Sequence, residues 1–263
     1  MPTGHPDDIH EEFVIVDEPV AVNARAPRPC QTQTPTPSTG YDPRMLRTEV
    51  DAILVEVLRD RRLLAHPFYR RWEAGTLERA ELADYAAQYR HFEAALPDVL
   101  ERVVQRIDDA TARHLVEANL ADERGVPAPH LELFEGFAAA VGAPASADAT
   151  PATAALVDLY TSVADESPVT ALAALAAYEV QASEIAASKA DGLRARYGIT
   201  DIGTLFWDVH SGADEVHGAW MVEALAGLAS NPDEVRDAAD AASAAWWAFL
   251  DEREAAAPVP LAC

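Results

Sequence analysis

Residues 44–254 consist almost without interruption of strong helix formers. Ala, Leu, Glu and Arg dominate this stretch, and no segment alternates apolar and polar residues as a half-buried strand would. The connections between helical segments are short, and no internal repeat divides the chain. The pattern therefore predicts an all-α fold, a single compact bundle of seven or eight helices over residues 43–255.

Start and stop signals place the helices within this stretch. Pro232 after Asn231 marks a helix start, whereas Gly142 and Gly198 mark helix ends. Pro97 lies inside an apolar-periodic run and predicts a kink near residues 94–96. The expected helices span residues 44–64, 78–105, 108–124, 129–141, 151–166, 169–195, 201–228 and 231–254.

The two ends of the chain differ from this helical region. Residues 1–42 are acidic and rich in Pro and Thr, with too few large apolar residues for a core, and predict a flexible tail. Phe13–Val16 is a small apolar run that could dock on the bundle, although a solvated tail is the favoured interpretation. Residues 256–263 are expected to fray.

Charge and cysteine content exclude several classes of partner. With 44 acidic against 20 basic residues, the net charge is −24, which argues against binding of nucleic acid or anionic lipid. No apolar run is long enough for a membrane span, and the N-terminus lacks the features of a signal peptide. Cys30 and Cys263 are not placed to staple a core. The sequence predicts a cytoplasmic protein with a small-molecule substrate.

One helical segment, FWDVHSGADEVHGAW, carries a possible metal-binding stripe. His210, Asp214 and His217 lie within about 60° of one another on a helical wheel. Their neighbours Trp207 and Met221 are apolar, so the stripe is expected to face the core. Burying two imidazoles and a carboxylate requires compensation. A divalent metal and a hydrogen-bonded pair of core histidines are both consistent with this helix alone.

Other segments add candidate ligands. Glu123 and His130 flank a Gly/Pro break that could fold both inward, although an exposed pair is the simpler reading of this segment alone. Glu179 lies within an alanine-rich apolar helix, where a carboxylate is costly without a cation. Three carboxylates and three imidazoles in a helical bundle suit two non-haem iron ions. The predicted ligands are Glu123, His130, Glu179, His210, Asp214 and His217.

Several other side chains have both a structural and a functional interpretation. Tyrosines 69, 85, 89 and 178 could be core fillers, substrate contacts or oxidised residues. Arg90 and Lys189 could bind a substrate carboxylate, with a surface ion pair as the alternative for Arg90. His66 is expected to end the first core helix. Trp246 and Trp247 cannot both face one core, so packing and a homodimer contact are both open.

The six predicted ligands carry a resemblance to a known superfamily. Their order, Glu, His, Glu and then H-x3-D-x2-H, resembles that of the haem-oxygenase-like di-iron oxidases, which share a fold with haem oxygenase, TenA and PqqC. The resemblance covers about residues 50–250. It implies a seven-helix haem-oxygenase-like bundle that holds two iron ions.

Within that superfamily, the segments LLAHPFYRRWEAGTL and NLADERG are similar to CADD-type para-aminobenzoate synthases. That group is understood to consume one of its own tyrosines, with a lysine as the amino source. The resemblance implies that Tyr69 or Tyr85 supplies the ring and Lys189 the nitrogen. The chain departs from the group at Tyr89-Arg90, where an adjacent tyrosine pair is common.

These observations favour an O2-dependent di-iron oxidase or oxygenase that acts on a small amino-acid-like substrate. It would use two Fe, O2 and an external reductant, pass through a peroxo-di-iron(III) intermediate, and serve specialised or cofactor metabolism. In this reading Arg90 and Tyr178 contact the substrate. Three alternatives remain open: self-sacrificing para-aminobenzoate synthesis, a metal-free PqqC/TenA-like enzyme, and a non-enzymatic binding protein.

Overall fold

The computed structural model describes residues 44–125 and 128–256, except for the side chains of residues 213–215. Over these ranges the regular structure is entirely helical, as expected from the sequence. None of the described helices combines the length and apolar composition that crossing a bilayer requires. The predicted tail of residues 1–42 and most of the predicted frayed end lie outside the described residues.

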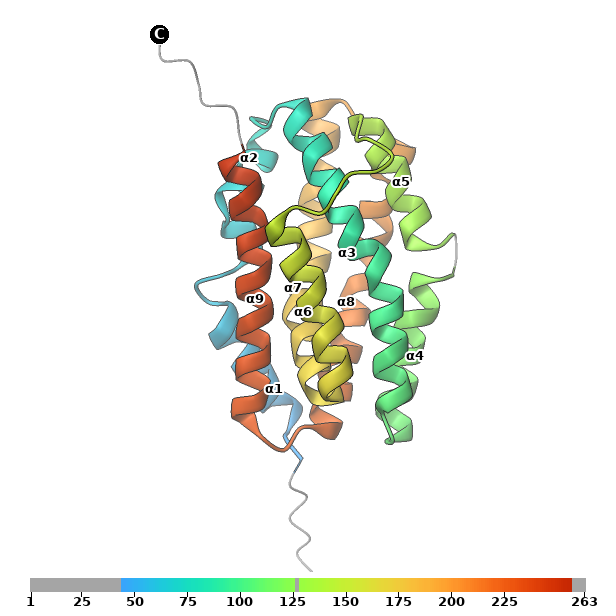
Figure 1. The fold of residues 1–263 in the computed structure, drawn as a ribbon, viewed down its shortest axis with the longest axis vertical. Coiled ribbons are helices and arrows are strands. Elements are labelled where there is room, and N and C mark those ends of the chain that lie inside the picture. Colours follow the sequence, from blue (N-terminus) through green and yellow to red (C-terminus); the bar gives the residue numbers. More distant parts are fainter. Residues whose placement is uncertain (1–43, 126–127, 257–263) are drawn as a thin grey trace, which may run out of the picture. The chain divides into compact units, whose positions relative to one another are not determined.

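The described chain forms a bundle of long helices (Figure 1). Helix α7 packs extensively on both α8 and α9, and α8 also packs on α4 and α5. The α7 segment is rich in buried alanines, whose small side chains allow this close packing. The elements in order are α1 (Arg47–Leu58), the 3-10 turn η1 (Leu63–Ala65), α2 (Pro67–Ala74), α3 (Arg79–Arg106), α4 (Ala110–Glu123), α5 (His130–Val141), α6 (Pro151–Glu166), α7 (Pro168–Gly192), the π-helical turn η2 (Leu193–Tyr197), α8 (Ile202–Leu228) and α9 (Pro232–Ala255).

Most predicted helix ends agree with the structure. Gly142 and Gly198 follow α5 and η2 with positive φ values of 82° and 64°, where glycine avoids the steric cost of a side chain. The side chain of Asn231 caps α9 by accepting a hydrogen bond from the Asp233 N–H at 3.1 Å. Helix α3 continues through Pro97 as one helix.

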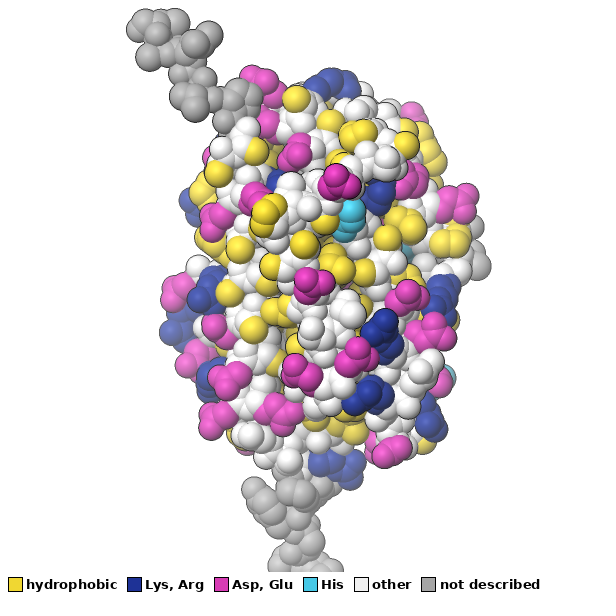
Figure 2. Space-filling model, viewed as in Figure 1, with side chains coloured by type: hydrophobic (Ala, Val, Ile, Leu, Met, Phe, Trp, Pro, Cys, Tyr) yellow, Lys and Arg dark blue, Asp and Glu magenta, His cyan; other side chains and the backbone are white. Residues whose placement is uncertain are grey.

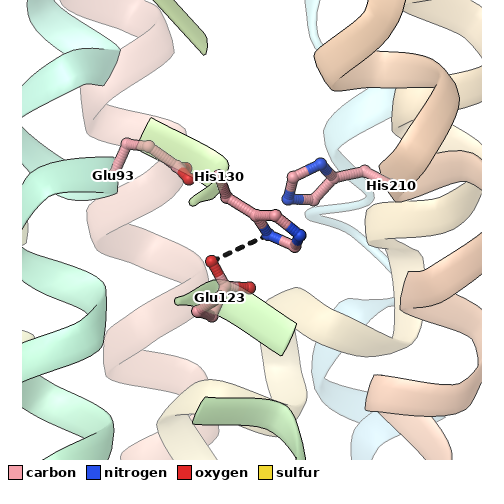
Figure 3. Close-up of side chains that lie close together, drawn as sticks. All are labelled: Glu93, Glu123, His130 and His210. Carbon is pink, nitrogen blue, oxygen red and sulfur yellow. Dashed lines mark ion pairs between the residues drawn. The ribbon is translucent and has the colours of Figure 1, made fainter. Parts of the chain in front are cut away.

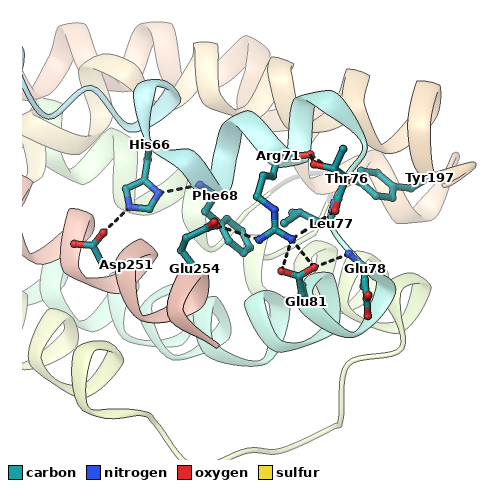
Figure 4. A network of polar contacts seen from close by, with 10 residues as sticks. All are labelled: His66, Phe68, Arg71, Thr76, Leu77, Glu78, Glu81, Tyr197, Asp251 and Glu254. Carbon is teal, nitrogen blue, oxygen red and sulfur yellow. Dashed lines mark hydrogen bonds and ion pairs between the residues drawn. The ribbon is translucent and has the colours of Figure 1, made fainter. Parts of the chain in front are cut away.

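The prediction for His66 is wrong. The expected helix over residues 44–64 ends at Leu58, and His66 begins α2 instead of ending a helix. Its Nδ1 accepts a hydrogen bond from the Phe68 N–H at 3.1 Å, and its Nε2 lies 3.1 Å from Asp251 Oδ1 (Figure 4). The following Pro67 occupies the first helical position, where a missing N–H costs nothing.

Ion pairs then fix α2 against the bundle. Arg71 contacts Glu81 of α3 at 2.8 Å and Glu254 of α9 at 3.2 Å (Figure 4). Helix α2 carries Tyr69 and Trp72, both of which are buried. These contacts therefore set the position of two aromatic side chains that line the interior.

The two adjacent tryptophans of α9 lie in different environments, one in the interior and one near the surface. Trp246 is buried and stacks on Tyr178 with ring centroids 4.4 Å apart, whereas Trp247 is half-buried and packs against His66. Figure 2 shows arginines interleaved with acidic side chains on the visible face. A homodimer contact through Trp247 stays a prediction.

Candidate metal centre

Four side chains from four helices meet inside the bundle (Figure 3). Glu93 of α3, Glu123 of α4, His130 of α5 and His210 of α8 each offer one oxygen or nitrogen, and these atoms all lie within 4.8 Å of one another. All four side chains are largely buried. The structure thus brings together three of the six predicted ligands and adds Glu93.

Glu123 and His130 face each other across the break between α4 and α5. Glu123 is the last residue of α4 and His130 the first of α5, and both side chains are buried. His130 Nδ1 lies 2.9 Å from Glu123 Oε2, yet the two atoms do not align as a hydrogen bond. Two buried polar atoms that approach without bonding fit a pair of ligands directed at a common cation.

The tautomer of His210 is set by its own helix. Its Nδ1 lies 2.8 Å from the carbonyl oxygen of Phe206, to which it donates its proton. Nε2 is then the ring nitrogen that carries the lone pair, the form in which histidine binds metals. The His210 and His130 rings are 4.3 Å apart between centroids.

Glu179 of α7 and His217 of α8 lie at a close approach of these two helices. Both are buried, and a Cβ added to Gly218 would lie 3.0 Å from the backbone oxygen of Glu179. His217 Nε2 is 3.1 Å from Asp122 Oδ2, which places it beside the turn of α4 that carries Glu123. Both residues are outside the four-residue cluster, and the side chain of Asp214 lies outside the described residues.

The donor set fits iron. Two carboxylates and two imidazoles, with no thiolate in the cluster, suit iron or manganese better than a structural zinc. Glu93, Glu123, His130 and His210 are the described residues that could hold a metal ion. Whether Glu179 and His217, on the adjacent α7 and α8, are also ligands stays a prediction.

Sequence reasoning missed Glu93, which is only 2% exposed. It lies four residues before Pro97, whose missing N–H leaves the carbonyl of Glu93 without its normal helical partner. A carboxylate in the apolar run HFEAALP was the available signal. The proline predicted a kink, and the acid four residues before it was not considered as a ligand.

The predicted lysine and tyrosines form a second buried cluster. Lys189 is 1% exposed, and its Nζ donates a hydrogen bond to the Tyr85 hydroxyl at 2.6 Å. The Tyr85 and Tyr69 hydroxyls are 2.9 Å apart, and the same Nζ lies 4.6 Å from the centre of the Tyr69 ring. The structure therefore brings together the three residues for which the resemblance implies a chemical role.

Aromatic contacts continue from this cluster toward Glu179, one of the predicted ligands. The rings of Tyr85 and Tyr89 stack at 5.5 Å, and the Tyr89 hydroxyl lies 2.7 Å from that of Tyr178, the neighbour of Glu179.

Burial raises the pKa of Tyr69, Tyr85 and Tyr89, so these side chains are neutral phenols at physiological pH.

The Arg90 side chain pairs with α5 and the loop after it, and with neither of the two clusters. Its Nε and Nη2 donate to the two carboxylate oxygens of Glu135 at 2.6 and 2.9 Å, and its Nη1 donates to the Pro144 carbonyl at 2.8 Å. These contacts match the surface ion pair considered for this residue. They tie α3 to α5 and to the loop that follows α5, and its predicted role as a substrate contact stays untested.

Comparison with known proteins agrees with this architecture. Residues 83–250 match the family model described as "Iron-containing redox enzyme". A 4-aminobenzoate synthase from Nitrosomonas europaea is 37% identical over 78% of this chain and 89% of its own length.

Solved structures show the same fold at lower identity. A CADD-like protein from Nostoc punctiforme has a TM-score of 0.65 at 19% identity, covering 80% of this chain and 98% of its own. A Shewanella denitrificans domain with a heme oxygenase-like fold has a TM-score of 0.62 at 17% identity, covering 79% and 90%. The described residues form nine α-helices instead of the seven or eight expected, because α2 was not predicted. The all-α, haem-oxygenase-like fold is confirmed, and the chain belongs to the iron-containing redox enzymes with this fold.

Proposed function

We propose that this chain makes 4-aminobenzoate from its own side chains. The observation that carries the proposal is Lys189, the only lysine among the 263 residues. It is buried, hydrogen-bonded to Tyr85 and positioned over the ring of Tyr69. The sequence alone favoured an external amino-acid-like substrate. The position of this lysine supports the self-sacrificing alternative.

The chemistry of the product explains why this arrangement suits the reaction. In 4-aminobenzoate the nitrogen occupies the ring position that bears the hydroxyl in tyrosine. A bond must therefore form between the amine nitrogen and this ring carbon, which loses its hydroxyl as water, while the Nζ–Cε bond of the lysine breaks. The carboxylate carbon is the tyrosine Cβ, which is released from Cα and oxidised with O2 as the oxidant. Nζ of Lys189 lies over the face of Tyr69, 4.6 Å from its centre, so Tyr69 supplies the ring in this proposal. Holding the amine at this distance lowers the entropic cost of bringing it to the ring.

Tyr85 has a different part in the proposal. Its hydroxyl accepts the hydrogen bond from Lys189 and lies 2.9 Å from the Tyr69 hydroxyl. It can thus carry a proton between the amine and the phenol that is to be replaced. Because burial keeps both phenols neutral, each retains the proton needed for such a transfer.

Iron at the candidate metal centre would supply O2 activation and the oxidising power, with an external reductant. Glu93, Glu123, His130 and His210 would hold it. The protein's own contribution is to bury the reacting groups and keep water from them. Similarity to the 4-aminobenzoate synthase of N. europaea supports this function over the metal-free and non-enzymatic alternatives.

Isotope labelling tests the proposal. Protein carrying ring-13C tyrosine and ε-15N lysine would be loaded with Fe(II) without oxygen, then exposed to O2 and reductant with no added substrate. We expect 4-aminobenzoate that contains both labels. Tyr69→Phe and Lys189→Arg should each abolish it. Unlabelled product, or formation only with an added amino acid, would instead favour an external substrate.

A further inference from the structure

Among the described aromatic rings within reach of the lysine amine, that of Trp207 has the nearest centre. Nζ of Lys189 is 4.0 Å from the Trp207 ring centre. The next ring centre, that of Tyr69, is 4.6 Å away, and the rings of Tyr85, Tyr89 and Trp72 follow at 4.9 to 5.9 Å. A tryptophan face attracts a cationic nitrogen more strongly than the other aromatic side chains do.

The orientation of the Trp207 ring is fixed by its neighbours. Phe137 and Phe206 meet it edge-on, with centroids 5.3 and 4.7 Å away and interplanar angles of 75° and 84°. Trp207 itself is 1% exposed. Its face toward Lys189 is therefore a rigid surface and not one of several rotamers.

The indole N–H indicates what this tryptophan is for. Trp207 Nε1 is buried and has no hydrogen-bond partner among the residues that the structure describes. Such a group costs free energy that phenylalanine at this position would avoid. The large indole face over Lys189 is the contact that offsets this cost. We propose that Trp207 is a positioning residue, which holds the Lys189 amine over Tyr69.

The position of Trp207 also links the amine to the metal centre. Trp207 lies three residues before His210 on α8, within the turn in which the Phe206 carbonyl accepts a hydrogen bond from His210 Nδ1–H. One rigid turn of α8 thus sets both a metal ligand and the amine. This inference rests on the proposed function, since positioning matters only if the amine reacts.

The single lysine makes the test unambiguous. In protein labelled with ε-13C lysine, one signal reports Lys189 without any assignment. Because Nζ, one bond from Cε, lies 4.0 Å from the Trp207 ring centre, the Cε protons should resonate upfield of those of an ordinary lysine. Trp207→Leu removes the ring, Trp207→Phe keeps a smaller one, and Trp247→Leu makes the same change in a half-buried residue that packs on His66.

We expect Trp207→Leu to lose the upfield shift and about tenfold or more of its 4-aminobenzoate yield, with iron content and folding retained. Trp207→Phe should recover part of both, and Trp247→Leu should match the unmodified chain. An ordinary lysine shift in the unmodified chain, or an undiminished yield in Trp207→Leu, would overturn the inference. Absence of 4-aminobenzoate from the unmodified chain would overturn the proposed function, while the lysine signal would still decide whether Trp207 holds the amine.

Discussion

A carboxylate as deeply buried as that of Glu93 is costly unless positive charge or hydrogen-bond donors compensate it. Glu93 lies among Glu123, His130 and His210. A cation bound there would offset the cost of burying both carboxylates and would bind the two imidazoles as well. The individual ligand types were readable from the sequence. The sequence did not show that Glu93 joins Glu123, His130 and His210, because the meeting of four helices depends on packing between distant segments.

Glu93→Gln keeps the shape of the side chain and removes its charge. We expect iron affinity to fall by about tenfold or more, because an anionic ligand is lost from a low-dielectric site. Iron content after anaerobic reconstitution at limiting Fe(II) would measure this. Glu135→Gln, at a more exposed carboxylate that pairs with Arg90, is the control and should bind iron normally. Equal iron content in the two variants would exclude Glu93 as a ligand.

His66 makes the stability depend on pH. Burial lowers its pKa, against the opposing effects of Asp251 and Glu254, so the folded state favours the neutral ring. This contribution is complete above the unfolded pKa of about 6.5 and is lost as the pH falls from there through the lower folded-state pKa. Protonation would also remove the Nδ1 acceptor that caps α2.

His66→Asn can keep a cap acceptor but cannot titrate. We expect its free energy of unfolding to fall less than that of the unmodified chain when the pH is lowered from 7.5 to 5.5, as measured by denaturant titration. His114→Asn changes an exposed histidine and should retain the original pH dependence. A pH dependence in His66→Asn as steep as in the unmodified chain would show that His66 is not responsible.

At the scale of helices, local patterns located most elements and missed the contacts between them. Gly142, Gly198 and Asn231 ended or began helices as expected because caps depend on neighbouring residues. The short α2 was missed because a proline and a histidine that begin a helix can also be read as the end of one. The meeting of Lys189 with Tyr69 and Tyr85 required the packing of α7 on α2 and α3, which no local pattern contains.

Gly218 permits the close approach of α8 to α7. A Cβ there would lie 3.0 Å from the Glu179 oxygen and 3.3 Å from the Val180 Cα, so Gly218→Ala should move α8 away from α7 by a few tenths of an ångström. We expect weaker iron binding through displacement of His217. Gly227→Ala on the same helix meets nothing within 4 Å and should stabilise the fold by about 0.5–1 kcal/mol with unchanged iron content.

Iron titration and thermal unfolding of both variants would measure these effects. Iron binding by Gly218→Ala that equals that of Gly227→Ala would show that the close approach of α7 and α8 is not needed for the metal centre.

At the scale of the whole molecule, the described bundle contains every side chain in the proposed chemistry. The backbone from Arg44 onward joins it directly, since the Met45 N–H donates to the Ala229 carbonyl at 2.8 Å. We therefore expect that removing residues 1–42 leaves the melting temperature and the iron content unchanged. The composition of this segment supports the same result, because its few apolar residues offer little to offset an ordering cost of about 1–2 kcal/mol per residue.

Comparison of the truncated and full-length chains by thermal unfolding and iron analysis would measure both quantities. A large loss of either would indicate that Phe13–Val16 docks on the bundle, the alternative that the sequence left open.

The central claim is that the chain is consumed by its own reaction. The intact mass of the iron-loaded protein should be measured before and after exposure to O2 and reductant, with no added substrate, while released 4-aminobenzoate is counted. We predict at most one product molecule per chain, a mass loss localised by peptide mapping to Tyr69, and a changed Lys189. An unchanged protein mass together with many turnovers of an added amino acid would contradict the claim.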